Sequence, residues 1–243
     1  MKYIKAFLIM FMFSTCGIDQ YIYLEPVNSA GIAVTSNTYA TVRLPSMDDS
    51  LYFKYFALYY RIYISGLLLS STVSTDLFTT VNAHLASDYS VFAPYLNNTS
   101  VSTSVDSLFT NRQYRRLALE GASVEDVLDD NVTSTTLVFD FTSTPGSIPS
   151  LVANSQRYKL QRTSGNGLFS PVPSNRYFLN TPELNASTNA TTAVNADVAD
   201  ATVTGTRYTY VALYIVSTGI DSNFAPVYSA PAFIGVFSLP EQF

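Results

Sequence analysis

The stretch of sequence that decides the fold is YFKYFALYYRIYI, Tyr52–Ile64. Aromatic and β-branched residues dominate it, and these are the residues enriched in β-strands. In its second half, the side chains of one face are Leu58, Tyr60, Ile62 and Ile64. The alternate positions Tyr59, Arg61 and Tyr63 fall on the opposite face. This period of two predicts a long central strand with one buried face and one solvated face.

A second stretch of the same kind, RYTYVALYIVST, lies near the other end of the chain at Arg207–Thr218. Further short strands are expected at 21–27, 31–35, 39–44, 107–119, 135–142, 157–163, 168–170, 227–229 and 232–239. Many short strands separated by turns, without alternation of strand and helix, indicate a sandwich or a barrel. We therefore predict a mainly all-β protein, an antiparallel β-sandwich in which the two long stretches are neighbours in one sheet.

The segment from about 70 to 130 has a different character and is expected to be an insertion with one or two short helices. Ser74 or Thr75 is suited to cap a helix that runs to Leu85, with apolar residues three and four positions apart. A second short helix is expected at 88–96, and an acidic turn or short helix at 123–130. Elsewhere, 165–167 is a Gly-Asn-Gly sequence typical of a hairpin turn, and 185–204 is expected to be a long surface loop.

The chain begins with a positively charged tip, Lys2 and Lys5, followed by the apolar run Ala6–Phe13. This run is too short to span a bilayer, which takes about 20 apolar residues, and the pattern is typical of a secretory signal peptide. Small residues then lead to Cys16, the only cysteine of the chain. We interpret Cys16 as a lipid attachment site; the alternative is a small apolar residue beside an ordinary signal cleavage site. The expected organisation is a lipoprotein signal peptide at 1–15, a lipidated leader at 16–20 and a single domain at 21–243.

The sequence around Cys16, Phe13-Ser14-Thr15-Cys16, resembles a relaxed bacterial lipobox, at which a diacylglyceryl group is attached to the cysteine sulfur. Four longer stretches extend the resemblance: CGIDQYIYLEPV (16–27), YFKYFALYYRIY (52–63), SGNGLFSPVPSNRYFLNTPELNAS (164–187) and YVALYIVSTGID…YSAPAFIGVFSLP (210–240). Together they are similar to treponemal (spirochaete) surface lipoproteins that carry a fibronectin-III- or immunoglobulin-like β-sandwich behind the lipid. The resemblance implies a place in the cell envelope and this fold, and it implies no activity.

The composition limits the classes of partner. Of the residues, 47% are hydrophobic and only 13% are charged, against about 25% charged in an average domain. The formal net charge of −5 becomes −7 when Lys2 and Lys5 leave with a signal peptide. This acidic balance argues against nucleic acid and against anionic lipid headgroups as partners. With one cysteine there is no intrachain disulfide, so the core and the sheet hydrogen bonds must provide the stability.

Residues that carry reaction chemistry are scarce. His84 is the only histidine, whereas nucleophilic and metal sites combine several such groups. The acidic cluster Glu125–Asn131 lacks the spacing of a calcium loop and is interpreted as a solvated turn. Arg112, Arg115 and Arg116 form a small basic spot, interpreted as charges that keep a strand edge solvated. We therefore predict no catalytic, metal-binding or cofactor-binding residues and no enzymatic activity.

The candidate binding surface is Tyr59, Arg61 and Tyr63, on the face of the long strand that the pattern predicts to be solvated. Exposed tyrosine is favoured at recognition surfaces because it offers a large contact area at low entropic cost. The alternatives are cross-strand aromatic pairing within the sheet and cover by the insertion. The chain has 18 tyrosines and no tryptophan, which counts against a sugar-binding platform.

Together these features predict a lipid-anchored protein of the cell envelope, at the outer membrane or on the periplasmic face of the inner membrane. Its expected role is a non-enzymatic binding, adhesion or envelope-structural module. Its partners are the membrane, through the lipid, and a protein or host ligand that the sequence does not identify. One alternative is an outer-membrane β-barrel, because a terminal Phe243 and tyrosine-rich alternating strands are typical of that class, although Pro240 and Glu241 interrupt the last strand. A hydrolase with unusual residues is a second alternative.

Overall fold

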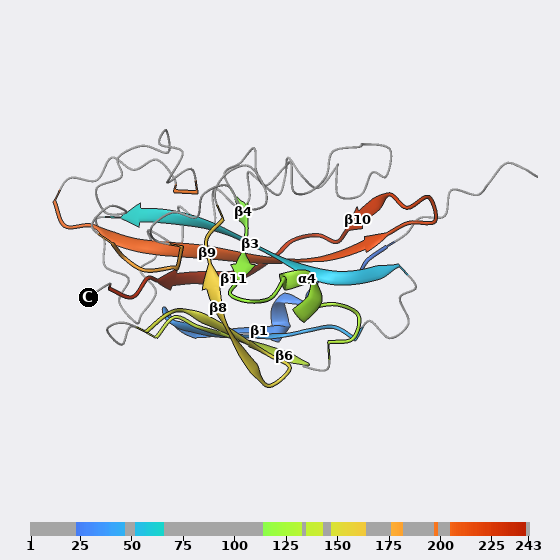
Figure 1. Ribbon diagram of the computed structural model, residues 1–243, viewed down its shortest axis with the longest axis horizontal. Helices are drawn as coiled ribbons and strands as arrows, with labels where there is room; N and C mark the ends of the chain where they lie inside the picture. The colour runs from blue at the N-terminus through green and yellow to red at the C-terminus, as the bar shows by residue number, and fades with distance from the viewer. Residues whose placement is uncertain are drawn as a thin grey trace, which may run out of the picture.

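Two antiparallel β-sheets stacked face to face form the body of the protein in the computed structural model (Figure 1). The structure describes residues 23–46, 52–65, 114–132, 135–142, 147–163, 176–181, 197–198 and 205–241. One sheet has six strands and the other has five. The predicted all-β antiparallel sandwich is confirmed.

The long central strands of the five-stranded sheet are β3 (Phe53–Ser65) and β9 (Tyr208–Ile220). They pair antiparallel along their whole length, from Phe53 opposite Gly219 to Ser65 opposite Tyr208. The prediction that the two tyrosine-rich stretches are neighbours in one sheet is therefore confirmed. In Figure 1 they cross the whole molecule as one layer, coloured cyan and orange.

Shorter strands complete this sheet on both sides of the central pair. On the far side of β9 lie β10 (Pro226–Tyr228) and β11 (Ala232–Ser238), which pair with different parts of its length. On the far side of β3 lies β4 (Arg115–Arg116), opposite Tyr59 and Tyr60. Strands β10 and β11 agree with the predictions at 227–229 and 232–239.

The six-stranded sheet is built mostly from hairpins. After the short 3-10 helix η1 (Ser29–Gly31), its strands are β1 (Ile32–Ser36), β2 (Tyr39–Arg43), β5 (Ala118–Leu119), β6 (Thr136–Asp140), β7 (Ser150–Ala153) and β8 (Gln156–Gln161). Their order across the sheet is β1-β2-β6-β7-β8-β5. The predicted strands at 31–35, 39–44 and 135–142 correspond to β1, β2 and β6.

The strand order follows the immunoglobulin-type sandwich in part. In that scheme, strands A, B and E share one sheet and strands C, F and G the other. Here β1-β2-β6 take the first set of places and β3-β9-β11 the second. Strand β4 lies beside β3 as strand C′ joins the C-F-G sheet of variable-type domains. The difference lies beyond β6, where β7 and β8 follow it in sequence, whereas strand D of the scheme precedes E.

Residues 114–119 pass from one sheet to the other. After β4 has paired with β3, the Leu117 amide donates to the Leu58 carbonyl at 2.9 Å, and β5 then pairs with β8. The short helix α4 (Val124–Val127) follows and begins after Ser123, whose Oγ accepts from the Asp126 amide at 3.2 Å. It agrees with the prediction of an acidic turn or short helix at 123–130.

The predicted insertion at about 70–130 therefore ends earlier than expected. Residues 114–130 contribute strands to both sheets and belong to the sandwich itself. The predicted strand at 107–119 is reduced, within the described residues, to the two short strands β4 and β5. The remainder of the insertion, with the helices predicted at 74–85 and 88–96, lies outside the described residues.

Strands β7 and β8 form a hairpin that the sequence pattern did not predict. Its turn residues Asn154 and Ser155 have φ angles of 51° and 61°, as the type I′ turns favoured in two-residue hairpins require. Asparagine tolerates this conformation, but serine adopts it less often, so the turn carries a weak signal. The hairpin expected around 165–167 lies outside the described residues, and the observed partners of β8 are β7 and β5.

The predicted edge strand at 21–27 is wrong for its described part. Residues 23–28 have no regular secondary structure, although Leu24 and Val27 are buried. Pro26 lacks the amide hydrogen that a strand ladder uses. This segment therefore packs on the sandwich through Leu24 and Val27 without joining a sheet.

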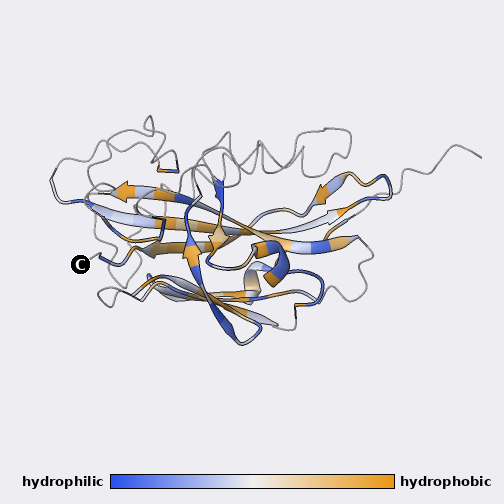
Figure 2. Cartoon of the chain, in the orientation of Figure 1, coloured by the Kyte–Doolittle hydropathy of each residue, from blue (hydrophilic) through white to orange (hydrophobic). Residues whose placement is uncertain are grey.

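The main core lies between the two sheets. Leu58, Tyr60, Ile62 and Ile64 all belong to it, so the predicted buried face of the long strand is confirmed. Aromatic rings fill the space: Phe141 stacks on Phe237 with ring centroids 4.8 Å apart and planes 6° apart. Hydrophobic colours are prominent along β11 in Figure 2, which agrees with the burial of its alternate residues.

Gly219 of β9 lies where the backbone just before β3 approaches it closely. A Cβ added at this position would lie 2.2 Å from the carbonyl oxygen of Tyr52 and 2.9 Å from its carbonyl carbon. Because these are backbone atoms at the start of β3, the clash can be relieved only by separating β3 from β9. We expect Gly219→Ala to lower the free energy of unfolding by about 3 kcal/mol, measured by urea denaturation.

Gly235→Ala is the matched control for this prediction. A Cβ at Gly235 would meet carbon atoms of the Phe237 and Val34 side chains at 3.1 Å, and side chains can move aside more easily than backbone. The loss of stability should therefore be smaller at Gly235 than at Gly219. Equal losses in the two variants would contradict the argument.

Candidate functional site

The candidate binding residues Tyr59, Arg61 and Tyr63 lie on the face of β3 that turns away from the main core, as the pattern predicts. Their side chains are nevertheless buried, with 1%, 8% and 8% of their surface exposed. The prediction that this face is solvated is therefore wrong for these residues. They do not form an exposed recognition surface.

Aromatic contacts account for the burial of this face. Tyr59 stands opposite Tyr214 of β9 and shares a hydrophobic cluster with it. The hydroxyls of Tyr63 and Tyr114 lie 3.0 Å apart, at hydrogen-bonding distance. The guanidinium carbon of Arg61 lies 5.2 Å from the centre of the Tyr63 ring, which is within the range of a cation–π contact. The Tyr59–Tyr214 contact is the cross-strand aromatic packing that the sequence left open as one alternative, and Tyr114 belongs to the predicted insertion that was the other.

The basic spot and the acidic cluster contact each other. Arg116 Nη1 lies 2.6 Å from Glu125 Oε1, and Arg116 Nη2 donates to the Tyr55 hydroxyl at 2.7 Å. Asp129 Oδ1 accepts from the Asn131 amide at 3.0 Å, as in a turn. In the ranges that the structure describes, no cluster of three His, Cys, Asp or Glu side chains could hold a metal ion. Cys16, His84 and Arg112 lie outside those ranges.

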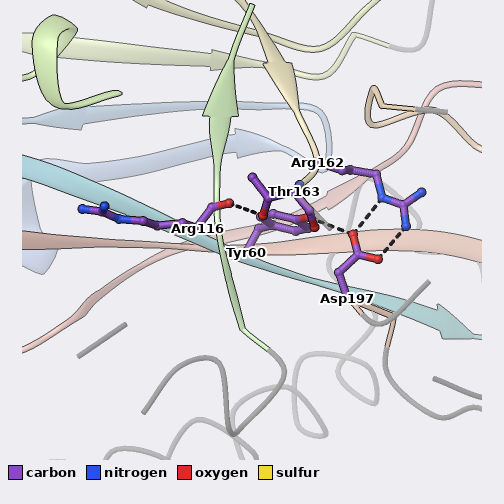
Figure 3. A network of polar contacts seen from close by, with 5 residues as sticks. All are labelled: Tyr60, Arg116, Arg162, Thr163 and Asp197. Atoms are coloured by element: carbon purple, nitrogen blue, oxygen red, sulfur yellow. Dashed lines mark hydrogen bonds and ion pairs between the residues drawn. The ribbon is translucent and has the colours of Figure 1, made fainter. Parts of the chain in front are cut away.

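A buried ion pair is the polar site that sequence reasoning missed. Arg162, just after β8, contacts Asp197 with two parallel hydrogen bonds: Nε donates to Oδ2 at 2.8 Å and Nη2 donates to Oδ1 at 2.6 Å (Figure 3). The two side chains are only 2% and 3% exposed. Such a fork-to-fork pair is strong and directional, and neither charge is available to solvent.

Tyr60 joins the pair to the core face of β3. Its hydroxyl donates to Asp197 Oδ2 at 2.8 Å and accepts from the Thr163 amide at 2.8 Å. Thr163 Oγ1 in turn donates to the Arg116 carbonyl oxygen at 2.7 Å. Figure 3 shows these residues converging from β3, from β4, from the end of β8 and from the segment that holds Asp197. Four parts of the chain that are distant in sequence thus meet in one network.

Backbone contacts place Asp197 and Val198 against the edge of β3. The Ile62 amide donates to the Asp197 carbonyl oxygen at 3.0 Å, and Val198 forms a parallel bridge with Ile62. Val198 is 1% exposed and belongs to the main core. The prediction of a surface loop at 185–204 is therefore wrong at these two residues. Nothing in the sequence distinguishes Asp197 from Asp200 in the same polar stretch.

Burial and the neighbouring charges set the protonation of Tyr60. Burial and the neighbouring Asp197 carboxylate raise the pKa of the Tyr60 hydroxyl well above its usual value. Burial acts to lower the pKa of Arg162, but the Asp197 carboxylate outweighs it and the net shift is upward. At neutral pH, Tyr60 is thus a neutral hydroxyl and Arg162 a cation. The network joins β3, β4 and the end of β8 to Asp197. Its ionic groups are buried and so are not accessible to a substrate.

A second, more exposed set of charges lies on the six-stranded sheet around Glu120. Lys159 Nζ lies 2.7 Å from Glu120 Oε2, the Tyr177 hydroxyl donates to Glu120, and Arg176 Nη2 is 3.6 Å from Glu120 Oε1. Hydrogen bonds from Lys159 and Tyr177 lower the pKa of Glu120. The cluster ties residues 176–177 to β8 and leaves Glu120 ionised at neutral pH.

Comparisons of the chain with protein-family models, with curated proteins and with solved structures found no match. The resemblance to spirochaete lipoproteins accordingly stays a prediction from the sequence. Among the described residues, no helix has the length and apolar character needed to cross a membrane. Any functional assignment must therefore rest on the residues of this chain.

The ion pair yields a test of its structural role. Asp197→Ala removes both acceptors and leaves the Arg162 charge buried alone, which costs about 3–5 kcal/mol of unfolding free energy in buried pairs. The double variant Arg162→Met/Asp197→Leu replaces the pair with apolar groups and should recover most of that loss. Urea denaturation of the three proteins measures both effects.

Glu125→Gln is the control, because the Arg116–Glu125 pair is partly exposed, with side-chain exposures of 35% and 45%. Its loss should cost about 0.2–1 kcal/mol. If Asp197→Ala were no more harmful than Glu125→Gln, the buried pair would not be what holds residues 197–198 in place. A double variant as unstable as the single one would also contradict the argument.

Two partly exposed carboxylates, Glu120 and Asp140, predict how the stability responds to acid. The pKa of Glu120 lies below its usual 4.5. Partial burial acts to raise the pKa of Asp140, but hydrogen bonds from Thr142 and Arg157 outweigh it and leave the pKa below its usual 3.8. The two carboxylates therefore contribute fully to stability when the pH is above their usual pKa values. This contribution is lost as the pH falls through their lower pKa values in the folded protein. The urea midpoint should fall between about pH 6 and pH 3, and less in Glu120→Gln/Asp140→Asn. An unchanged acid slope in that double variant would refute the assignment.

Proposed function

We propose that this chain is a lipid-anchored protein of the cell envelope, at the outer membrane or on the periplasmic face of the inner membrane. The observation that carries the proposal is the position of Cys16. The only cysteine of the chain directly follows a short apolar run with Lys2 and Lys5 at its tip. This is where a lipoprotein signal requires its cysteine, and a bacterial lipid modification with several acyl chains exceeds what stable membrane anchoring needs.

The start of the sandwich supports a short tether. Leu24 is buried in the main core, and it follows Cys16 by eight residues. An extended chain of that length spans at most about 29 Å. A lipid on Cys16 would therefore hold the sandwich close to the bilayer surface. Such a distance suits a module that acts at or near the membrane.

The arrangement of charges in the sandwich supports a binding or structural role without catalysis. The carboxylate of Asp197 is enclosed by Arg162 and Tyr60. At the surface, Glu120 and Asp140 each contact a cationic side chain. Carboxylates held in this way stabilise strands and loops. We accordingly propose an adhesion, ligand-binding or envelope-structural module as the role of the sandwich.

Metabolic labelling with a fatty acid tests the anchor. In a bacterial host that processes lipoproteins, the wild-type chain should take up the label, because the acyl groups are added at the Cys16 sulfur. Cys16→Ala should lose the label completely, whereas Ser14→Ala should keep it, since the alanine is small and leaves the sulfur in place. Gel fluorography and membrane fractionation measure the outcome. Equal labelling of wild type and Cys16→Ala would refute the proposal.

A further inference from the structure

The turn between β9 and β10 is a rigid loop built around Asp221. Asp221 Oδ1 accepts from the amides of Asn223 and Ala225 at 2.8 and 2.7 Å. The Asp221 amide donates to the Ala225 carbonyl at 2.9 Å, and the Phe224 amide donates to the Asp221 carbonyl at 3.0 Å. Four hydrogen bonds thus fix the conformation of five residues.

This loop presents Phe224 in an unfavourable state. Its side chain is 84% exposed, and its φ angle of 63° is left-handed. A left-handed conformation is costly for any residue with a Cβ, and an aromatic side chain in water loses the benefit of burial. Neither feature helps the sandwich to fold. Strained residues held by their surroundings are concentrated at functional sites.

The loop lies at the end of the sandwich where the tether enters. Ser217 Oγ donates to the Glu25 carbonyl oxygen at 2.7 Å, and Leu24 Cδ1 lies 3.1 Å from where a Cβ on Gly219 would stand. Figure 1 shows the start of the described chain, in blue, at the same end of β9 as the loop that leads to β10. Tyr23, just before Leu24, is 73% exposed. Two exposed aromatic residues, Tyr23 and Phe224, therefore lie at the end of the molecule where the described chain begins.

We propose that the Asp221–Ala225 loop is a second membrane contact, in which Phe224 enters the interfacial layer of the bilayer that carries the Cys16 lipid. The inference rests on the proposed function, because the lipid defines which surface this end meets. The tether spans at most about 29 Å. By contrast, β9 has 13 residues and extends for about 40 Å. The far end of the sandwich is therefore kept away from the bilayer surface.

The chemistry of this end favours an uncharged lipid surface. Among the described residues near this loop, Glu25, Lys54 near the start of β3 and Asp221 carry charges, and their formal sum is −1. Asp221 is already engaged with backbone amides. The contact would thus rely on the aromatic groups, which are favoured at the boundary between headgroups and acyl chains. The expected occupant is a zwitterionic phospholipid layer.

A tryptophan reporter tests the contact, because the chain contains no tryptophan. The chain from Cys16 onward is coupled through its single thiol to a maleimide phospholipid in phosphatidylcholine vesicles. In Phe224→Trp, tryptophan emission should shift to the blue on coupling, and bromolipids in the vesicle should quench about half of it. Because the lipid is attached chemically, this result does not depend on whether cells modify Cys16, which fatty-acid labelling alone decides.

Tyr39→Trp is the matched control at the opposite end of the sandwich. Tyr39 is 36% exposed, and the neighbouring Asn37 contacts Ser238, which stands opposite Tyr210 near the start of β9. Its emission should be the same before and after coupling. If Phe224→Trp behaved like Tyr39→Trp in lipid, the inference would be overturned. Shielding of the Phe224→Trp reporter only by added envelope proteins, and not by vesicles, would indicate a protein partner and overturn it as well.

Phe224→Gly separates membrane contact from folding. Glycine adopts the left-handed conformation without cost, so the variant should melt about 2–4 °C higher than wild type. In a Tyr23→Trp chain, the same substitution should reduce quenching by bromolipids, because the neighbouring anchor is lost. Quenching of Tyr23→Trp that is unchanged by Phe224→Gly would count against the role of Phe224.

Discussion

The structure depends on the antiparallel pairing of β3 with β9, which joins residues 53–65 to residues 208–220. Every other strand of the five-stranded sheet pairs with one of these two. The pair is apolar on both faces: one packs on the six-stranded sheet, and the other is covered by tyrosines with Arg61 among them. Because the pairing joins distant parts of the chain, it closes long loops whose entropic cost must be offset by this two-sided burial.

A long strand that pairs on only one edge leaves hydrogen-bonding groups open on the other, and here three separate segments cover the second edge of β3. Leu128 accepts from the Phe56 amide, β4 pairs at Tyr59 and Tyr60, and Asp197 accepts from the Ile62 amide. Short covering pieces protect an edge from pairing with other chains. The third piece is held by the buried Arg162–Asp197 ion pair, whose bidentate geometry and Tyr60 hydrogen bond set where the segment docks.

The two functional proposals place different demands on one body. The sandwich has its buried Arg162–Asp197 charges paired and its tyrosine-rich face buried, and both features stabilise the fold. Its distinctive surface feature lies at one end, where the loop around Asp221 holds an exposed Phe224 in a left-handed conformation. With a lipid on Cys16, that end faces the membrane and the opposite end of β9 faces outward. Orientation relative to the bilayer then determines which loops are available to a partner.

The sequence alone determined the sandwich class, the pairing of the two long stretches and the buried face of β3, because alternation along a strand depends on local geometry. It also predicts a lipid site at Cys16, which lies outside the described residues. It left open whether Tyr59, Arg61 and Tyr63 are exposed or buried, since a half-polar face gives the same pattern whether water or other side chains cover it. The Arg162–Asp197 pair and the strained Phe224 were decided only by the tertiary structure. The ion pair depends on where distant segments meet in space, whereas the backbone angle and exposure of Phe224 depend on how the Asp221–Ala225 loop is closed. The spacing of residues along the chain records neither.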